Sequence, residues 1–135
     1  MDIRLQTLGQ MKITRFEDID AWKEARELAQ RIYHVSESGK LAKDLGLRDQ
    51  MRRAAVSVMA NIAEGFDSQS DGEFIQFLIY ARRSASEVQL HLYVALDHHY
   101  ITRQEFDSLY EMAIKAKNLI GGFIRYLRGN RHPQT

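Results

Sequence analysis

The chain of 135 residues contains no cysteine and one proline, Pro133. Without cysteine it can form neither disulfide bridges nor thiolate metal sites. No uncharged run approaches the length of a membrane span, and the first residues, MDIRLQTLGQMKI, lack the apolar core and cleavage site of a secretory signal. These absences favour a soluble cytoplasmic protein, and the length suits a single domain with one buried core.

A charge excess of either sign is also missing, because 19 Lys and Arg residues nearly balance 18 Asp and Glu residues. The charges are nevertheless uneven: residues 67–101 hold two basic and five acidic residues, whereas residues 102–135 hold six and three. An anion-binding surface is therefore expected to use arginines that crowd together in the sequence. The candidates are Arg48, Arg52, Arg53, Arg125 and Arg128. The alternative is an ordinary solvated helix face, with C-terminal cations favoured by the helix dipole.

What the sequence does contain is a helical repeat of apolar residues, without a convincing strand pattern. The repeat predicts four helices, over Phe16–Ser36, Leu47–Phe66, Ser70–Asp97 and Thr102–Arg128. Capping-box sequences open the last two helices, and Gly65 suits a left-handed cap at the end of the second. Short connections make sequential helices antiparallel neighbours. We therefore expect an all-α fold, an up-down-up-down four-helix bundle.

The bundle is expected to cover residues 14–128. Residues 1–13 are predicted to be a flexible N-terminal extension, since Met11 is a second candidate start directly before the patterned region. Gly129 and Asn130 are expected to stop the last helix. Residues 129–135 would then be a polar C-terminal tail.

The second predicted helix lacks a continuous polar face. Its segment QMRRAAVSVMANIAEG carries no charge from Ala54 to Ala63, and a helix that is apolar all round must be covered on more than one side. The third predicted helix has a second apolar stripe as well. A monomer would expose an unusually large apolar patch, so we expect self-association into a closed ring. The predicted interface residues are Val56, Ala60, Ile75 and Ile79.

Polar residues interrupt the facing apolar stripes of these two helices. They are Ser57 and Asn61 in the second helix, and Ser84 and Glu87 in the third. A buried polar group without a partner costs about 1 to 3 kcal/mol, so these side chains should hydrogen-bond one another or the backbone. We interpret the four residues as a structural polar network that fixes the helix register.

Several segments together resemble a known family. They are Gly46-Leu47-Arg48-Asp49-Gln50, Arg52-Arg53-Ala54, Val56-Ser57, Asn61-Ile62-Ala63-Glu64-Gly65, Phe74 to Leu78, and Ser84 with Glu87, Gln89 and Leu90. Over about Thr14 to Arg128 the chain resembles the four-helix-bundle proteins encoded by intervening sequences in bacterial 23S ribosomal RNA genes. Their superfamily includes the accessory variability determinant, a helper of the reverse transcriptase in diversity-generating retroelements.

The resemblance implies a non-enzymatic bundle that assembles as a homopentameric ring. It also implies a role in binding RNA, DNA or a nucleic-acid enzyme such as a reverse transcriptase. The chain departs from the family pattern at Arg83, where glycine is common, and over residues 40–45, where the family usually has a proline. The retroelement proteins look strongly basic and this chain is nearly neutral, so the intervening-sequence branch is the closer likeness.

Two other functions fit parts of the sequence. One is a structural ring that binds a protein partner without nucleic acid. The other is a helical RNase similar to the HEPN group, in which Arg128 and His132 would supply the catalytic Arg and His. Because this pair flanks the expected helix stop, it is poorly placed to hold catalytic geometry. No metal-ligand spacing or phosphate-binding glycine loop is present, so we predict no catalytic residue, metal or cofactor.

Overall fold

The computed structural model describes residues 7–8 and 11–131. Its helices are α1 (Asp20–Val35), α2 (Gly39–Lys43), α3 (Leu45–Phe66), α4 (Asp71–Asp97) and α5 (Arg103–Arg131). A 3-10 turn, η2 (Phe16–Asp18), precedes α1, and two short strands, β1 (Thr7–Leu8) and β2 (Met11–Lys12), pair antiparallel before it. Every regular element from Phe16 onward is helical, so the prediction of an all-α fold is confirmed.

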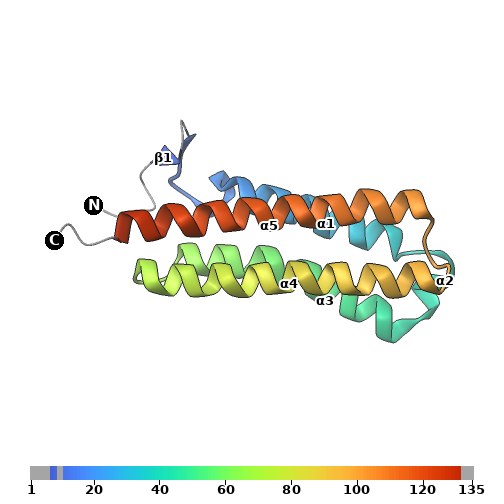
Figure 1. The fold of residues 1–135 in the computed structure, drawn as a ribbon. Coiled ribbons are helices and arrows are strands. Elements are labelled where there is room, and N and C mark those ends of the chain that lie inside the picture. Colours follow the sequence, from blue (N-terminus) through green and yellow to red (C-terminus); the bar gives the residue numbers. More distant parts are fainter. Residues whose placement is uncertain (1–6, 9–10, 132–135) are drawn as a thin grey trace.

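The four long helices lie side by side in two layers, α1 with α5 and α3 with α4 (Figure 1). The packing of α3 against α4 is the most extensive, followed by that of α4 against α5, and α1 packs against both α3 and α5. The connections are short: the one from α1 to α3 through α2 and the one from α4 to α5 lie at one end of the bundle, and the one from α3 to α4 lies at the other (Figure 1). No helix in the part of the chain that the structure describes is long and apolar enough to cross a membrane.

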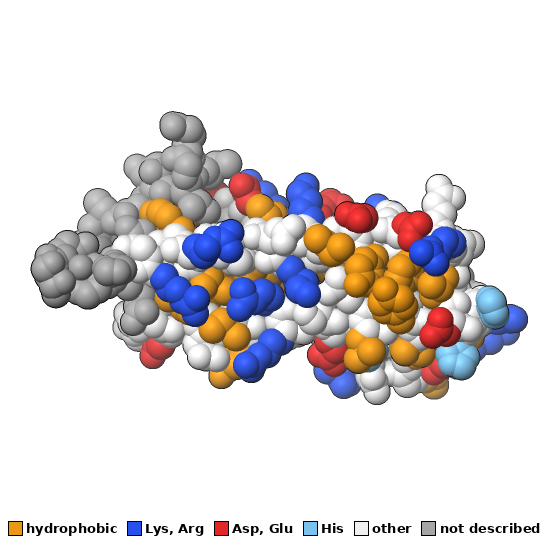
Figure 2. Space-filling model, in the orientation of Figure 1, with side chains coloured by type: hydrophobic (Ala, Val, Ile, Leu, Met, Phe, Trp, Pro, Cys, Tyr) orange, Lys and Arg blue, Asp and Glu red, His pale blue; other side chains and the backbone are white. Residues whose placement is uncertain are grey.

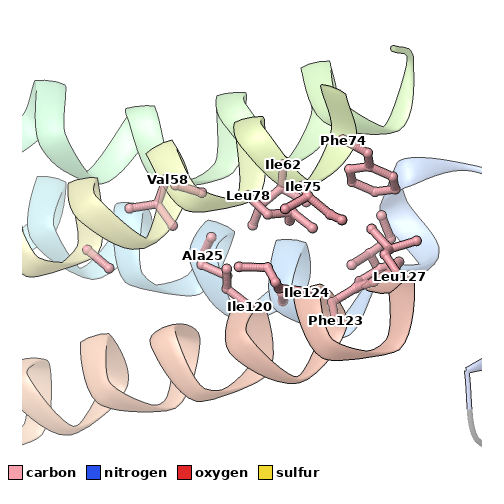
Figure 3. Close-up of a cluster of buried hydrophobic side chains, with 14 of the residues drawn as sticks. Ala25, Val58, Ile62, Phe74, Ile75, Leu78, Ile120, Phe123, Ile124 and Leu127 are labelled. Carbon is pink, nitrogen blue, oxygen red and sulfur yellow. The ribbon is translucent and has the colours of Figure 1, made fainter. Parts of the chain in front are cut away.

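The core follows from the apolar stripes of the sequence. All four long helices contribute to it, and Figure 3 shows Ala25, Val58, Leu78 and Ile120 meeting between them. Each of these four side chains is completely buried. A second cluster continues the core toward the α2 end of the bundle, around Leu28, Met51 and Leu92. The helical period of the sequence therefore identifies the inward faces correctly.

The predicted capping box is confirmed in full at α5 and in part at α4, where the glutamate bonds the residue before the N-cap. At α4, the Ser70 hydroxyl accepts the Glu73 backbone N–H at 3.2 Å, while the Glu73 carboxylate accepts the Gln69 N–H at 2.8 Å. At α5, Thr102 and Glu105 bond each other's backbone N–H groups at 3.0 and 2.8 Å. These bonds satisfy amides that have no partner inside the helix, which explains why both helices begin where the sequence predicts.

The prediction that Gly65 caps its helix in a left-handed conformation is wrong. Among the described glycines, Gly39 has a positive φ of 70°. Gly65 instead lies within α3, where a Cβ atom would lie 2.7 Å from the Phe74 ring and 2.9 Å from Cβ of Phe77. The glycine is thus needed for the close approach of α3 and α4 rather than for a turn.

The boundaries of the bundle also differ from the predicted ones. Helix α5 passes through Gly129 and Asn130 and ends at Arg131, so the predicted last helical residue, Arg128, is three residues early. Residues 132–135 of the predicted tail lie outside the described residues, as do residues 1–6 and 9–10 of the predicted extension. Ile13, at the end of that extension, is 2 % exposed and packs in the core.

Candidate nucleic-acid interface

Three members of the predicted polar network meet between α3 and α4. The hydroxyl oxygens of Ser57 and Ser84 lie 2.9 Å apart, and the Asn61 amide donates to the Ser57 carbonyl and hydroxyl oxygens at 2.8 and 3.0 Å. Glu87 is not part of this group, since its carboxylate is half exposed and lies 3.6 Å from Nε2 of His91. The network therefore consists of two serines and one asparagine, which we call the polar seam.

Two of the predicted anion-binding arginines make contacts within the chain. The Arg52 Nε donates to the Ser36 hydroxyl at 2.9 Å, and its guanidinium lies 4.4 Å from the centre of the Tyr33 ring. Arg48 pairs with the Asp49 carboxylate at 3.0 Å and donates to the Ala42 carbonyl at 3.4 Å. Arg52 thus holds the C-terminal end of α1, where a cation is favoured by the helix dipole.

The other three predicted arginines are exposed but lie at opposite ends of the molecule. Arg53 is in the first half of α3, near the α2 end of the bundle, whereas Arg125 and Arg128 occupy the last turns of α5 at the other end (Figure 1). One chain therefore does not bring the five predicted residues together. The pair on α5 is the better start of an anion site, because it has further basic neighbours.

Those neighbours are Arg82 of α4 and Lys117 of α5. A Cβ atom at Gly121 would lie 3.6 Å from Nη1 of Arg125 and 3.8 Å from Nη1 of Arg82, so both guanidinium groups lie over the same glycine. Lys117, one turn before Gly121 on α5, donates to the side-chain oxygen of Gln89 on α4 at 3.0 Å. Figure 2 shows Lys and Arg side chains gathered over this part of the α4–α5 face.

We call Arg82, Lys117, Arg125 and Arg128 the basic cluster. Within residues 7–8 and 11–131, none of these four side chains pairs with a carboxylate, although ion pairs occur elsewhere on the surface. Like charges held close together without counter-charges raise the local positive potential. The cluster can therefore attract an anion such as a phosphate group.

An aromatic cluster occupies the other half of the same face. Tyr93 of α4 lies 4.9 Å from the ring of Phe106 and 5.6 Å from that of Tyr110, and the last two rings stack at 5.2 Å. A hydrogen bond to Tyr93 and burial raise the pKa of the Tyr110 phenol above its usual value of 10. The guanidinium of Arg103 lies 5.6 Å from the Phe106 ring centre.

The sequence interpretation missed Arg82 and the aromatic cluster because each depends on two helices that meet only in the folded chain. One signal was present for α5, since residues 110, 117, 121, 125 and 128 follow at intervals of seven, four, four and three. Such intervals place residues on one side of a helix. The partners on α4 required knowledge of the packing.

The four predicted interface residues do not share one surface. Val56 is 40 % exposed, and Ala60 and Ile79 are partly exposed. Ile75 is 6 % exposed and packs in the core with Phe74 and Leu78 (Figure 3), because its position on α4 turns toward α5. Ile75 is therefore a core residue and not part of an outer face. For the RNase alternative, Arg128 is exposed on α5, while His132 lies outside the described residues.

The comparisons with known proteins agree with the resemblance seen in the sequence. The family model of the 23S rRNA-intervening sequence protein matches residues 17–122. A crystal structure of a protein with unknown function from the S23 ribosomal protein family of Bacteroides thetaiotaomicron VPI-5482 matches with a TM-score of 0.73 and 26 % sequence identity. This match covers 78 % of the present chain and 95 % of that chain. No curated protein matches the chain significantly.

Proposed function

The chain belongs to the family of 23S rRNA-intervening sequence proteins, and we propose that it is a non-enzymatic adaptor that binds nucleic acid through the basic cluster. The observation that carries the proposal is the position of Arg82 and Arg125 over Gly121 without a carboxylate partner in the described chain. Phosphate contacts supply most of the affinity in non-specific nucleic-acid binding, and arginine suits them because of its fixed fork of donors.

The cluster is small, and the net charge of the chain is +1, so one copy offers few phosphate-binding groups. We propose that the bundle, in the predicted up-down-up-down order, assembles into a ring in which the basic cluster repeats by symmetry. Val56 and Ala60 on the outer side of α3 support this assembly, because a copy alone exposes them. Repetition multiplies a weak interaction when one strand reaches several copies.

Salt-dependent binding tests the proposal. Fluorescence anisotropy with labelled RNA and DNA should give an affinity that falls as salt rises, because bound phosphates release counterions. In the double variant Arg125→Glu with Arg128→Glu, affinity should drop and the salt slope should decrease by about one unit for each phosphate that is no longer bound.

Two control variants test whether the position of the reversed charge matters, rather than the change in net charge alone. Arg53→Glu reverses an exposed arginine at the other end of the bundle, and Lys23→Glu changes an exposed lysine of α1. Both should leave binding nearly unchanged. Affinity that does not respond to salt, or that drops equally in all three variants, would contradict the electrostatic model and favour a ring that recognises a protein partner.

A further inference from the structure

Part of the aromatic cluster and a neighbouring leucine are exposed to solvent. Tyr93 is 47 % exposed and Leu90, one turn earlier on α4, is 60 % exposed. The Phe106 ring beneath them is buried, and it contacts both Tyr93 and Tyr110. The rings thus form a firmly supported platform with one open side, which suits stacking by a flat ligand.

The platform and the basic cluster lie along one line of the surface where α4 packs against α5. Tyr93, Gln89 and Arg82 follow along α4, and Tyr110, Lys117, Gly121 and Arg125 run antiparallel along α5. Figure 2 shows the largest hydrophobic patch on one half of this face and most of its Lys and Arg side chains, with smaller hydrophobic patches between them, on the other. From Tyr110 to Arg125 is about 22 Å of helix, the length of about six stacked nucleotides.

Gly121 and Gly122 remove side chains from α5 where the guanidinium groups meet. A Cβ atom at Gly122 would lie 3.8 Å from Nη2 of Arg125, so the two glycines leave room for the guanidinium groups to lie close to the α5 backbone. The two guanidinium groups suit a phosphate, and the platform suits a base.

These two ligands occur together in single-stranded nucleic acid. In a duplex the bases are paired and stacked inside, so an outer helix face reaches mainly phosphates and the exposed rings would gain nothing. Resting on the proposed nucleic-acid function, we propose that the α4–α5 face binds single strands in preference to duplexes, with bases stacked on Tyr93 and phosphates held between Arg82 and Arg125.

The first test uses the full-length protein and three labelled probes of one sequence, each about 12 nucleotides long. They are a single strand, the same strand with abasic sites, which keeps its phosphates, and the matching duplex. The intact strand should bind at least about fivefold more tightly than the abasic strand, since stacking on an aromatic ring contributes that much or more. RNA and DNA versions of the probes identify which nucleic acid is preferred.

The second test uses matched variants of α4. Tyr93→Leu should weaken binding of the intact strand by at least about fivefold and leave the abasic strand unaffected. Tyr80→Leu is the control, because Tyr80 is 42 % exposed on the same helix and contacts Phe77 rather than the aromatic cluster. Arg82→Gln with Arg125→Gln should lower the single-strand salt slope by about 0.7 for each phosphate released. Tyr93→Phe, which keeps the ring, should restore binding.

The outcomes separate this inference from the function on which it rests. If neither strand nor duplex binds, the nucleic-acid function itself is wrong. If the arginine variants weaken binding but duplex and abasic probes bind as tightly as the intact strand, the function stands and the single-strand inference is overturned. A Tyr93→Leu variant that binds normally but has a lower mass by light scattering would place Tyr93 between subunits and also overturn it.

Discussion

At the scale of single residues, Gly65 is a closely packed position. It lies inside α3, where alanine would normally be the better helix former by about 1 kcal/mol. The Phe74 ring and Cβ of Phe77 leave no room for a methyl group, however. Steric exclusion and helix propensity therefore act in opposite directions at this position.

We predict that Gly65→Ala destabilises the protein by about 1 to 3 kcal/mol, the usual cost of overpacking. Gly129→Ala is the matched control, since Gly129 is also within a helix but a Cβ atom there would meet nothing within 4 Å. The control should be neutral or slightly stabilising. Urea denaturation measures both free energies of unfolding, and equal effects would show that packing does not require this glycine.

The Tyr100 phenol is a second residue with a measurable consequence. It donates to the Asp44 carboxylate at 3.1 Å, and this hydrogen bond raises the phenol pKa above its usual value of 10. Because the folded pKa is above the unfolded one, the stabilisation is complete below the unfolded pKa and is lost as the pH rises through the folded value. The free energy of unfolding should therefore fall from about pH 9 to about pH 11, and it should fall less in Tyr100→Phe. Parallel pH dependences of the two proteins would refute this linkage.

At the scale of elements, the end of α4 is held by a residue in an uncommon conformation. His99 has φ of 61°, and the Tyr100 N–H bonds the Ala95 carbonyl at 2.8 Å in the pattern that closes many helices. A non-glycine residue in this region carries a cost of about 1 to 2 kcal/mol. No residue pattern indicates this turn in advance, because glycine is the usual residue there and this chain has histidine.

Replacing His99 with glycine is therefore predicted to stabilise the protein by about 1 kcal/mol. His98→Gly serves as the control, since His98 has a negative φ of −93° and gains nothing from glycine. Thermal unfolding of the two variants would test this. A melting temperature that is lower for His99→Gly than for the unmodified chain would contradict the prediction.

The elements themselves are largely predictable from sequence, because their signals are local. The helical spacing of the apolar residues predicts which face of each long helix is buried, and the capping side chains predict where α4 and α5 begin. The sequence does not predict the short helix α2, because five residues are too few to show a helical repeat of apolar residues. The role of Gly65 is also missed, because its neighbours on α4 come from a later part of the chain.

At the scale of the whole molecule, the candidate site is predictable only in part. Arg125 and Arg128 share a helix and can be grouped from their spacing, whereas Arg82 joins them only after α4 packs on α5. Arg48 and Arg52 are equivalent to the others by charge, but interactions with Asp49 and Ser36 give them other roles. The sequence therefore identifies the basic residues, but only the folded structure shows which of them interact with other side chains.

The proposed assembly gives one prediction at this scale. Light scattering should report a mass several times that of one chain, and Ala60→Glu should lower it, because an unpaired charge would be buried between copies. Gln50→Glu adds the same charge at an exposed site of α3 and should leave the mass unchanged. A monodisperse monomer at micromolar concentration would end the ring proposal.

The polar seam restricts where residues can be inserted into the protein chain or deleted from it. One residue inserted into α3 before Ser57 would rotate Ser57 and all later turns by about 100° relative to the turns before the insertion, so that either the bond to Ser84 or the packing of the earlier turns is lost. Extra residues between α4 and α5 would leave both serines in place. Insertions and deletions that preserve the protein are thus confined to the connections, where variants of different length remain able to fold.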